Sequence, residues 1–124
     1  MQIPATSFIG KSNKIYVFTV HEIDYECKDE SGVYVFCKKS ELENNKIRYI
    51  PIYFGKAKHF DKRFYNHHKG DCIENEEADC LCLLKESKED SRVKIENDLL
   101  AAYNTPCNEI NNTQESNPTS SPNF

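Results

Sequence analysis

The sequence lacks any long apolar run, and no stretch approaches the length of about 18 residues that a membrane-spanning helix requires. Residues 1–10 also lack the charged start and long apolar centre of a secretion signal. We therefore expect a cytoplasmic protein with no membrane partner. Seven phenylalanines and seven tyrosines among 124 residues are enough apolar mass for the core of one compact domain.

The sequence also lacks an excess of positive charge. Its formal net charge is −4, which argues against a protein that coats nucleic acid nonspecifically. The charge is unevenly distributed, however, because residues 52–70 carry five lysines and arginines against a single acid, Asp61. Residues 71–90 are strongly acidic. A basic stripe on an acidic protein is better suited to a local anion site than to a broad binding face.

Standard zinc-ligand spacing is missing too, although the chain has six cysteines. Without a secretion signal, we predict that all six are reduced thiols. The alternative is a zinc site, formed where two histidines lie close in sequence to three of the cysteines: His67, His68, Cys72, Cys80 and Cys82.

Four apolar, β-rich segments predict strands over residues 14–20, 31–39, 47–55 and 78–84. The polar stretch at 40–45 predicts a hairpin loop, so the second and third strands should be antiparallel neighbours. Pro51 should lie at a strand start, an edge or a bulge, because proline cannot donate a ladder hydrogen bond. Apolar residues throughout 78–84 favour a strand covered on both faces, with a buried helix as the alternative.

Two helices are expected. Phe60, Phe64 and His67 have helical spacing, with Gly70 as a stop. The second helix covers residues 91–103, opened by a capping pair at Ser87 and Asp90, and Pro106 ends it. From residue 109 onward the chain is polar and is predicted to be disordered.

Two positions on these helices carry chemistry. Glu96 lies among Val93, Leu99 and Leu100 on the face that should pack inward, so its carboxylate must be paired in a salt bridge, protonated or bound to a metal. Arg63 and His67 are four residues apart, which indicates either a solvated basic helix face or an anion site. Lys56 and Lys58, placed in the strand-to-helix turn, favour a phosphate site there.

Several of these residues form an ordered set. GVY at residues 32–34 is followed by YFG at residues 53–55. Four single residues then follow in order: Arg63, His67, Glu96 and Asn108. This set, over about residues 31–110, resembles the motifs of the GIY-YIG nuclease superfamily, and most of all the N-terminal nuclease domain of UvrC excision-repair proteins.

The resemblance implies an α+β fold with a three-stranded antiparallel core sheet, flanked by helices and with room for an extra N-terminal strand. Residues 1–30 would be an N-terminal extension packing on the domain, residues 31–110 the nuclease domain, and residues 111–124 a disordered tail. The implied activity is hydrolysis of a DNA phosphodiester with one divalent metal ion, Mg²⁺ or Mn²⁺.

The resemblance also assigns roles by position. Glu96 would be the metal ligand, and Arg63 would stabilise charge on the scissile phosphate. The other catalytic positions are Tyr34 and Tyr53 facing the reaction centre, Lys56 assisting them, His67 as a candidate proton carrier, and Asn108 bracing the site. Lys58 and Lys62 would bind DNA phosphates. Either Tyr34 or a metal-bound water could be the base, since a free phenol has a pKa of about 10 and would need it lowered by about 3 units to ionise at pH 7.

The resemblance is incomplete. The loop at residues 38–48 is longer than in compact relatives, and YFG stands where the motif has YIG. These 124 residues contain no second nuclease module or helix-hairpin-helix region, so specificity is expected from loops, a homodimer or a protein partner. Two other functions stay open: a catalytically inactive GIY-YIG module that binds DNA or protein, and an unrelated zinc-binding adaptor. Repair, restriction and mobile-element roles all fit the resemblance.

Overall fold

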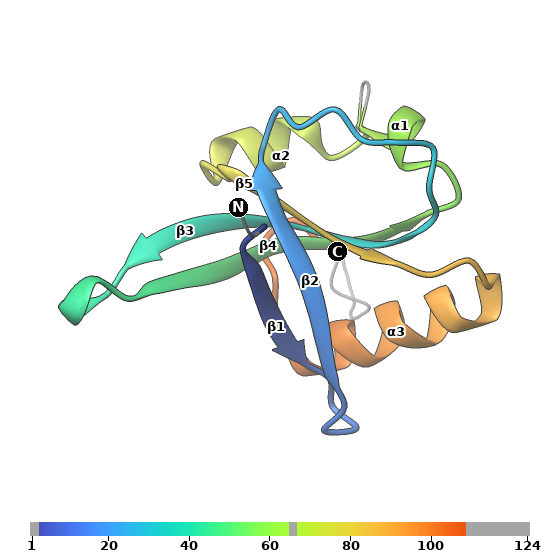
Figure 1. Ribbon diagram of the computed structural model, residues 1–124, viewed down its shortest axis with the longest axis horizontal. Coiled ribbons are helices and arrows are strands. Elements are labelled where there is room, and N and C mark those ends of the chain that lie inside the picture. The colour runs from blue at the N-terminus through green and yellow to red at the C-terminus, as the bar shows by residue number, and fades with distance from the viewer. Residues whose placement is uncertain (1–2, 65–66, 109–124) are drawn as a thin grey trace, which may run out of the picture.

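The computed structural model describes residues 3–64 and 67–108. Within them, an antiparallel sheet of five strands carries three α-helices, which is an α+β arrangement (Figure 1). The sheet order is β1-β2-β5-β3-β4. Its strands are β1 (Ala5–Ile9), β2 (Ile15–Glu22), β3 (Gly32–Glu41), β4 (Ile47–Ala57) and β5 (Cys80–Lys85). The helices are α1 (Phe60–Arg63), α2 (Gly70–Asn75) and α3 (Glu89–Ala102), and Glu43–Asn45 form one turn of 3₁₀ helix.

Both faces of the sheet are covered, with α1 and α2 on one side and α3 on the other (Figure 1). Successive strand residues point to opposite faces, so Val33 and Val35 pack in the cluster with Leu99 of α3, whereas Tyr34 and Phe36 pack in the cluster with Phe60 of α1. This explains why residues 32–37 are buried without a break. Burial of each large apolar side chain contributes about 1.5–3 kcal/mol.

The predicted hairpin of the second and third strands is confirmed as β3 and β4, which pair antiparallel. Pro51 lies next to a register shift at Phe36/Cys37, on a strand at the edge of the sheet. Both features accommodate a residue that cannot donate a ladder hydrogen bond. The prediction of a strand covered on both faces is also confirmed, because β5 lies between β2 and β3 and residues 80–83 are buried.

The sheet is larger than the three-stranded core expected from the sequence. Residues 1–30 supply two strands, because β1 pairs with β2 and β2 pairs with β5. Phe8 of β1 and Phe18 of β2 are buried in the α3-side cluster. The N-terminal segment therefore contributes core residues to the same sheet as the motif strands.

The predicted helix from Phe60 to His67 is wrong in extent, since α1 ends at Arg63 and Gly70 begins α2 instead of stopping a helix. The predicted capping pair is also wrong, because α3 begins at Glu89 with no side-chain hydrogen bond at its N-cap. Instead Arg92 Nη1 donates to the carbonyl oxygens of Glu86 (3.1 Å) and Ser87 (2.9 Å).

The prediction that all six cysteines are reduced thiols is wrong for two of them, because Cys72 and Cys107 form a disulfide. The predicted disordered tail from residue 109 lies outside the described residues. Within residues 3–64 and 67–108, no helix combines the length and apolar character needed to cross a membrane.

Candidate active site

The hydroxyl of Tyr34 is the meeting point of three segments. Arg63 Nε, at the end of α1, donates to Tyr34 Oη at 3.1 Å, and His67 Nε2 lies 2.7 Å from the same oxygen. Tyr53 of β4 lies beside them, with its ring centroid 6.0 Å from that of Tyr34. The predicted association of Tyr34, Tyr53, Arg63 and His67 is therefore present, although Arg63 and His67 do not share one helix.

Aromatic packing holds this arrangement in place. The ring of Phe64 packs edge-on against Tyr34 with centroids 4.8 Å apart, and His67 packs on Tyr34 in the same way at 5.8 Å. The backbone N–H of Phe60 donates to the carbonyl of Glu30 at 2.7 Å, which fixes the start of α1. Arg63 is thus positioned by a short helix whose apolar residues are anchored on the sheet.

The hydrogen bonds of His67 define its tautomer. The backbone N–H of Lys69 donates to His67 Nδ1 at 3.0 Å, so Nδ1 is an acceptor and the proton of the neutral ring is on Nε2, which donates to Tyr34 Oη. Burial, and after it the charges of His68, Arg63 and Lys69, lower the pKa of His67 to about 4. At pH 7 His67 is therefore a neutral donor to Tyr34, and its predicted role as a proton carrier stays a prediction.

Tyr34 experiences opposing influences. Its phenol is buried, and burial raises its pKa well above the ordinary value, with Tyr53 adding to the rise. Arg63 acts in the opposite direction through its charge and its hydrogen bond. Burial prevails, so Tyr34 is protonated at neutral pH in this structure.

Glu96 of α3 faces Lys56 of β4. Their side chains form an ion pair with a distance of 3.0 Å from Lys56 Nζ to Glu96 Oε1, and the Glu96 side chain is only 14% exposed. The inward orientation predicted for Glu96 is therefore present, and its partner here is a lysine. Both the salt bridge and the metal site proposed from sequence remain compatible with this geometry.

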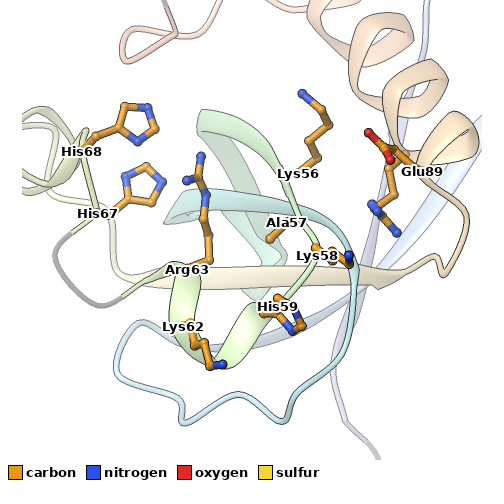
Figure 2. Close-up of a pocket in the computed structure, with 10 residues that line it drawn as sticks. Lys56, Ala57, Lys58, His59, Lys62, Arg63, His67, His68 and Glu89 are labelled. Atoms are coloured by element: carbon orange, nitrogen blue, oxygen red, sulfur yellow. The ribbon is translucent and has the colours of Figure 1, made fainter.

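A cavity of about 600 Å³ is lined by Arg63 and His67 from the first group and by Lys56 from the second, but not by Tyr34 or Glu96 (Figure 2). Arg63 and His67 stand on one side of it, and Lys56 and Glu89 on the other. The remaining lining residues are Ala57, Lys58, His59, Lys62, His68 and Arg92. Lys58 and Lys62, the predicted phosphate-binding residues, are exposed and line this cavity. The cavity is dominated by positive charge, which suits a phosphate ligand.

Two further residues support β4 behind the site. Asn108 accepts a hydrogen bond from the backbone N–H of Phe54 and donates to its carbonyl, both at 2.9 Å, so its predicted bracing position is present. Thr105 Oγ1 donates to the same Asn108 oxygen. Gly55 leaves the space that the Tyr34 phenol occupies, because a Cβ at that position would overlap the ring and hydroxyl.

Arg92 was not predicted from the sequence, and His68 was considered there only as a zinc ligand. The Tyr53 hydroxyl lies 3.5 Å from His68 Nε2, and the His67 and His68 rings stack with centroids 4.6 Å apart. Arg92 lies one helical turn before Glu96 and lines the cavity. The spacing of four residues between Arg92 and Glu96 was the one available signal.

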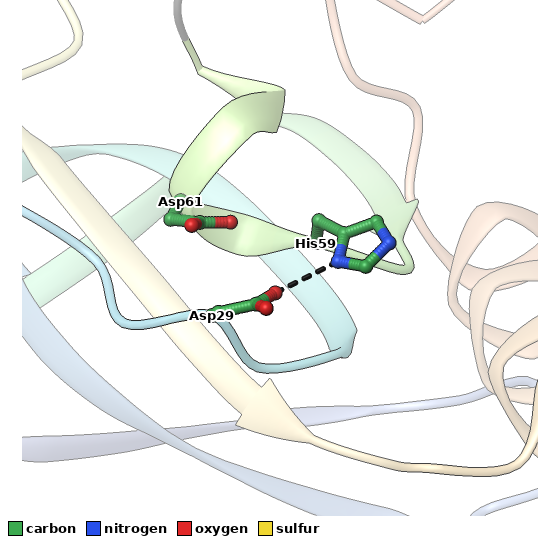
Figure 3. Close-up of side chains that lie close together, drawn as sticks. All are labelled: Asp29, His59 and Asp61. Carbon is green, nitrogen blue, oxygen red and sulfur yellow. Dashed lines mark hydrogen bonds and ion pairs between the residues drawn. The ribbon is translucent and has the colours of Figure 1, made fainter.

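Asp29, His59 and Asp61 form a separate exposed group whose ligand atoms lie within 4.8 Å of one another (Figure 3). His59 Nδ1 and Asp29 Oδ1 are 2.7 Å apart. This group contains none of the predicted metal ligands.

The zinc site considered from the sequence does not form. Cys72 is bonded to Cys107, and Cys80 and Cys82 lie in the cluster on the α3 side of the sheet. His67 instead contacts Tyr34 on the opposite side.

Comparisons of the chain with protein-family models, curated proteins and solved structures found no match. The function inferred for this protein therefore depends on the chemistry of its own side chains.

Proposed function

We propose that this protein is a metal-dependent DNA endonuclease of the GIY-YIG type. The observation that supports this most strongly is the contact of Arg63 and His67 with the Tyr34 hydroxyl beside a cationic cavity. These residues come from separate segments, and the family's motif spacing anticipates their association. A protein that used them only to stabilise its core would not need a cluster of cations around an open cavity.

Arg63 is the group best placed to act on a phosphate. Its Nε donates to Tyr34, and the guanidinium carries further N–H groups that can donate to phosphate oxygens. Its planar fork matches the geometry of two such oxygens, and its charge stabilises the negative charge that builds up during displacement. Tyr34 in turn fixes the orientation of the guanidinium.

Tyr34 would orient the attacking water or accept its proton. Acceptance requires an ionised phenol, which the Arg63 and His67 donors favour and burial opposes. With the proton still on Tyr34, the hydroxyl is a donor that can orient a water molecule at the phosphate. His67, with Nδ1 held by the Lys69 backbone, keeps the phenol in position for either role.

Glu96 fits the single metal ion that the family resemblance implies. Mg²⁺ is commonly bound through one or two carboxylates together with substrate phosphates and water, so one largely buried carboxylate is enough. A divalent cation bound there would supply positive charge to stabilise the phosphate and to favour ionised Tyr34. Lys56, now paired with Glu96, would then be available to contact the phosphate.

The experiment is a cleavage assay on linear, nicked, flap and branched DNA in Mg²⁺, Mn²⁺ and EDTA. Wild-type protein should cut at least one substrate only when a divalent ion is present. Glu96→Gln should lower the rate by at least about 100-fold, because loss of the carboxylate removes several kcal/mol of charge stabilisation. Glu89→Gln, which alters an acid on the wall of the cationic cavity, should retain the wild-type rate. A folded Glu96→Gln protein that cuts like wild type would rule out Glu96 as the metal ligand.

A second candidate is a catalytically inactive module of the same fold that binds DNA or protein. The ion pair of Lys56 with Glu96 and the protonated Tyr34 favour it, because both satisfy the site without a metal. This candidate predicts DNA binding with no cleavage of any of the four substrates in either metal ion.

A further inference from the structure

Arg92 is a buried cation outside the predicted catalytic set. It is 6% exposed, in the first turn of α3, and its Nη1 donates to the carbonyl oxygens of Glu86 and Ser87. These bonds use one of the three guanidinium nitrogens. Within residues 3–64 and 67–108, no carboxylate forms an ion pair with Arg92. A buried charge without a counter-charge is costly, so an anion is the expected partner.

Arg92 lies on the boundary between two cavities. The first, of about 600 Å³, contains Arg63 and His67 of the proposed catalytic centre. The second, of about 670 Å³, is lined by Lys85, Ser31 and residues of the turn before α3. Lys58, His59 and Arg92 line both. An anion bound at this boundary would therefore be next to the catalytic cavity and separate from Tyr34.

The acids near this boundary already have other partners. Asp29 pairs with His59 at 2.7 Å, and Glu30 pairs with Lys85 at 3.4 Å. Glu86 Oε2 accepts a hydrogen bond from the Lys88 backbone, at 3.1 Å.

Among the described residues, two cations at the boundary form no ion pair. Glu89, on the wall of the first cavity, is exposed and forms no ion pair with Arg92. Those two cations are Lys58 and Arg92, which have no carboxylate partner in the part of the chain described here.

We propose that Arg92 and Lys58 form a second phosphate-binding site, which holds a phosphate of the nucleic-acid strand beside the one that is cut. This extension rests on the proposed nuclease function. A guanidinium can donate two parallel N–H groups to a phosphate, and a lysine adds a point charge. The fixed position of Arg92, set by the Glu86 and Ser87 carbonyls, would set the register of the strand relative to Tyr34 and Arg63.

The test is equilibrium binding of short fluorescent oligonucleotides, single-stranded and duplex, in EDTA so that cleavage plays no part. Arg92→Gln should weaken binding by about 10- to 100-fold, since a hydrogen bond to a charged group is lost together with its charge. The slope of log affinity against log salt should fall by about one. Lys58→Ala should act in the same direction, and Lys94→Ala, an exposed lysine on α3 outside both cavities, should leave binding unchanged.

Oligonucleotides in which one phosphate at a time is replaced by a neutral methylphosphonate locate the phosphate that Arg92 contacts. With wild-type protein, one substituted phosphate should reduce the affinity as much as Arg92→Gln does. The same substituted phosphate should not reduce the affinity of the Arg92→Gln variant any further. Oligonucleotides with and without a terminal phosphate distinguish the source, because a site for strand ends would lose affinity only when the terminal phosphate is removed. That result would identify the ligand as the terminal phosphate of a strand end, and not as the phosphodiester beside the one that is cut.

Wild-type affinity and an unchanged salt slope in folded Arg92→Gln would overturn the second site. Weaker binding with an unchanged salt slope would also overturn it, by showing that Arg92 acts only through the fold. If Arg92→Gln does not fold, Lys58→Ala decides the question, because Lys58 is exposed. Failure of wild-type protein to cut DNA would refute the nuclease proposal without changing these binding results.

Discussion

At the scale of single residues, Tyr34 shows how burial and hydrogen bonding compete. Its oxygen receives N–H donors from Arg63 and His67, which stabilise an ionised phenol, yet burial keeps it protonated. Positive charge added near a phenol in this position lowers its pKa and so favours the ionised form. The cavity next to it, lined by lysine and arginine, is where such charge would act.

Acid should destabilise the fold through His67. The pKa of His67 is lowered to about 4, below the ordinary value of about 6.5, so the unfolded chain binds this proton more tightly. Stability from this group is complete above about pH 6.5 and is lost as the pH falls toward 4. With allowance for its partial exposure, we expect a loss of about 1 kcal/mol between pH 7 and pH 5.

The measurement is thermal unfolding of wild type and His67→Gln at pH 7 and pH 5. Wild type should lose about 4 °C more than the variant on acidification, because glutamine does not titrate. Equal losses in the two proteins would show that His67 is not held neutral by the fold.

The sequence predicted some of these residue contacts and missed others. The motif resemblance grouped Tyr34, Arg63 and His67 in one site, and in the structure Arg63 and His67 both contact the Tyr34 hydroxyl. The neutral state of His67 could not be predicted, since it depends on the Lys69 backbone and on burial. Arg92 was missed because an arginine on a polar helix face looks exposed until the turn at Glu86 and Ser87 is placed beside it.

At the scale of elements, the β3–β4 hairpin places Tyr34 opposite Gly55. Gly55→Ala should therefore push the Tyr34 ring out of position, since a Cβ there overlaps the ring and hydroxyl. We expect the free energy of unfolding to fall by about 1–3 kcal/mol and the cleavage rate to fall by at least about 10-fold. Thermal unfolding and single-turnover cleavage measure the two effects.

Gly70→Ala is the matched control, because a Cβ at Gly70 meets open space. It should leave both stability and cleavage near wild-type values. A Gly55→Ala protein with wild-type stability and rate would show that the Tyr34 ring does not depend on this close approach.

The helix error has a physical explanation at the same scale. Phe60, Phe64 and His67 were expected to mark one helix face, but they share a packing target instead. Each ring contacts Tyr34, with centroid distances of 6.5, 4.8 and 5.8 Å. Periodic apolar residues indicate a common buried neighbour, and a continuous helix is only one way to reach it. The strands were predicted better because residues 31–39 and 47–55 are rich in β-branched and aromatic residues, a local signal that does not depend on distant contacts.

At the scale of the whole molecule, the Cys72–Cys107 disulfide joins α2 to the segment that carries Asn108. It closes a loop with a sequence separation of 35, so its loss should cost about 3–4 kcal/mol of stability. Reductant should lower the melting temperature of wild type by about 10–15 °C.

Two variants serve as controls for this effect. Cys107→Ser should already melt at the lower temperature and should not respond to reductant. Cys27→Ser, which alters a free cysteine, should respond as wild type does. Identical melting of wild type with and without reductant would contradict a contribution from the disulfide.

The N-terminal strands show what the sequence could not supply at this scale. The resemblance covers about residues 31–110, so it carried no information on how β1 and β2 attach. The pairing of β2 with β5 depends on contacts between residues about 60 apart in the chain, which local patterns do not specify. The α+β class, in contrast, was implied by the resemblance and agrees with the strands and helices predicted from local patterns.

The central claim is that Tyr34, Arg63 and Glu96 serve one metal-dependent hydrolytic site. The most direct measurement is single-turnover cleavage of supercoiled plasmid in Mg²⁺ by wild type, Tyr34→Phe, Arg63→Ala and the double variant. Wild type should cut, each single variant should be slower by at least about 100-fold, and the double variant should be no slower than the worse single variant, as for groups that act together. Absence of cutting by wild type, or a wild-type rate in folded Arg63→Ala, would contradict the claim.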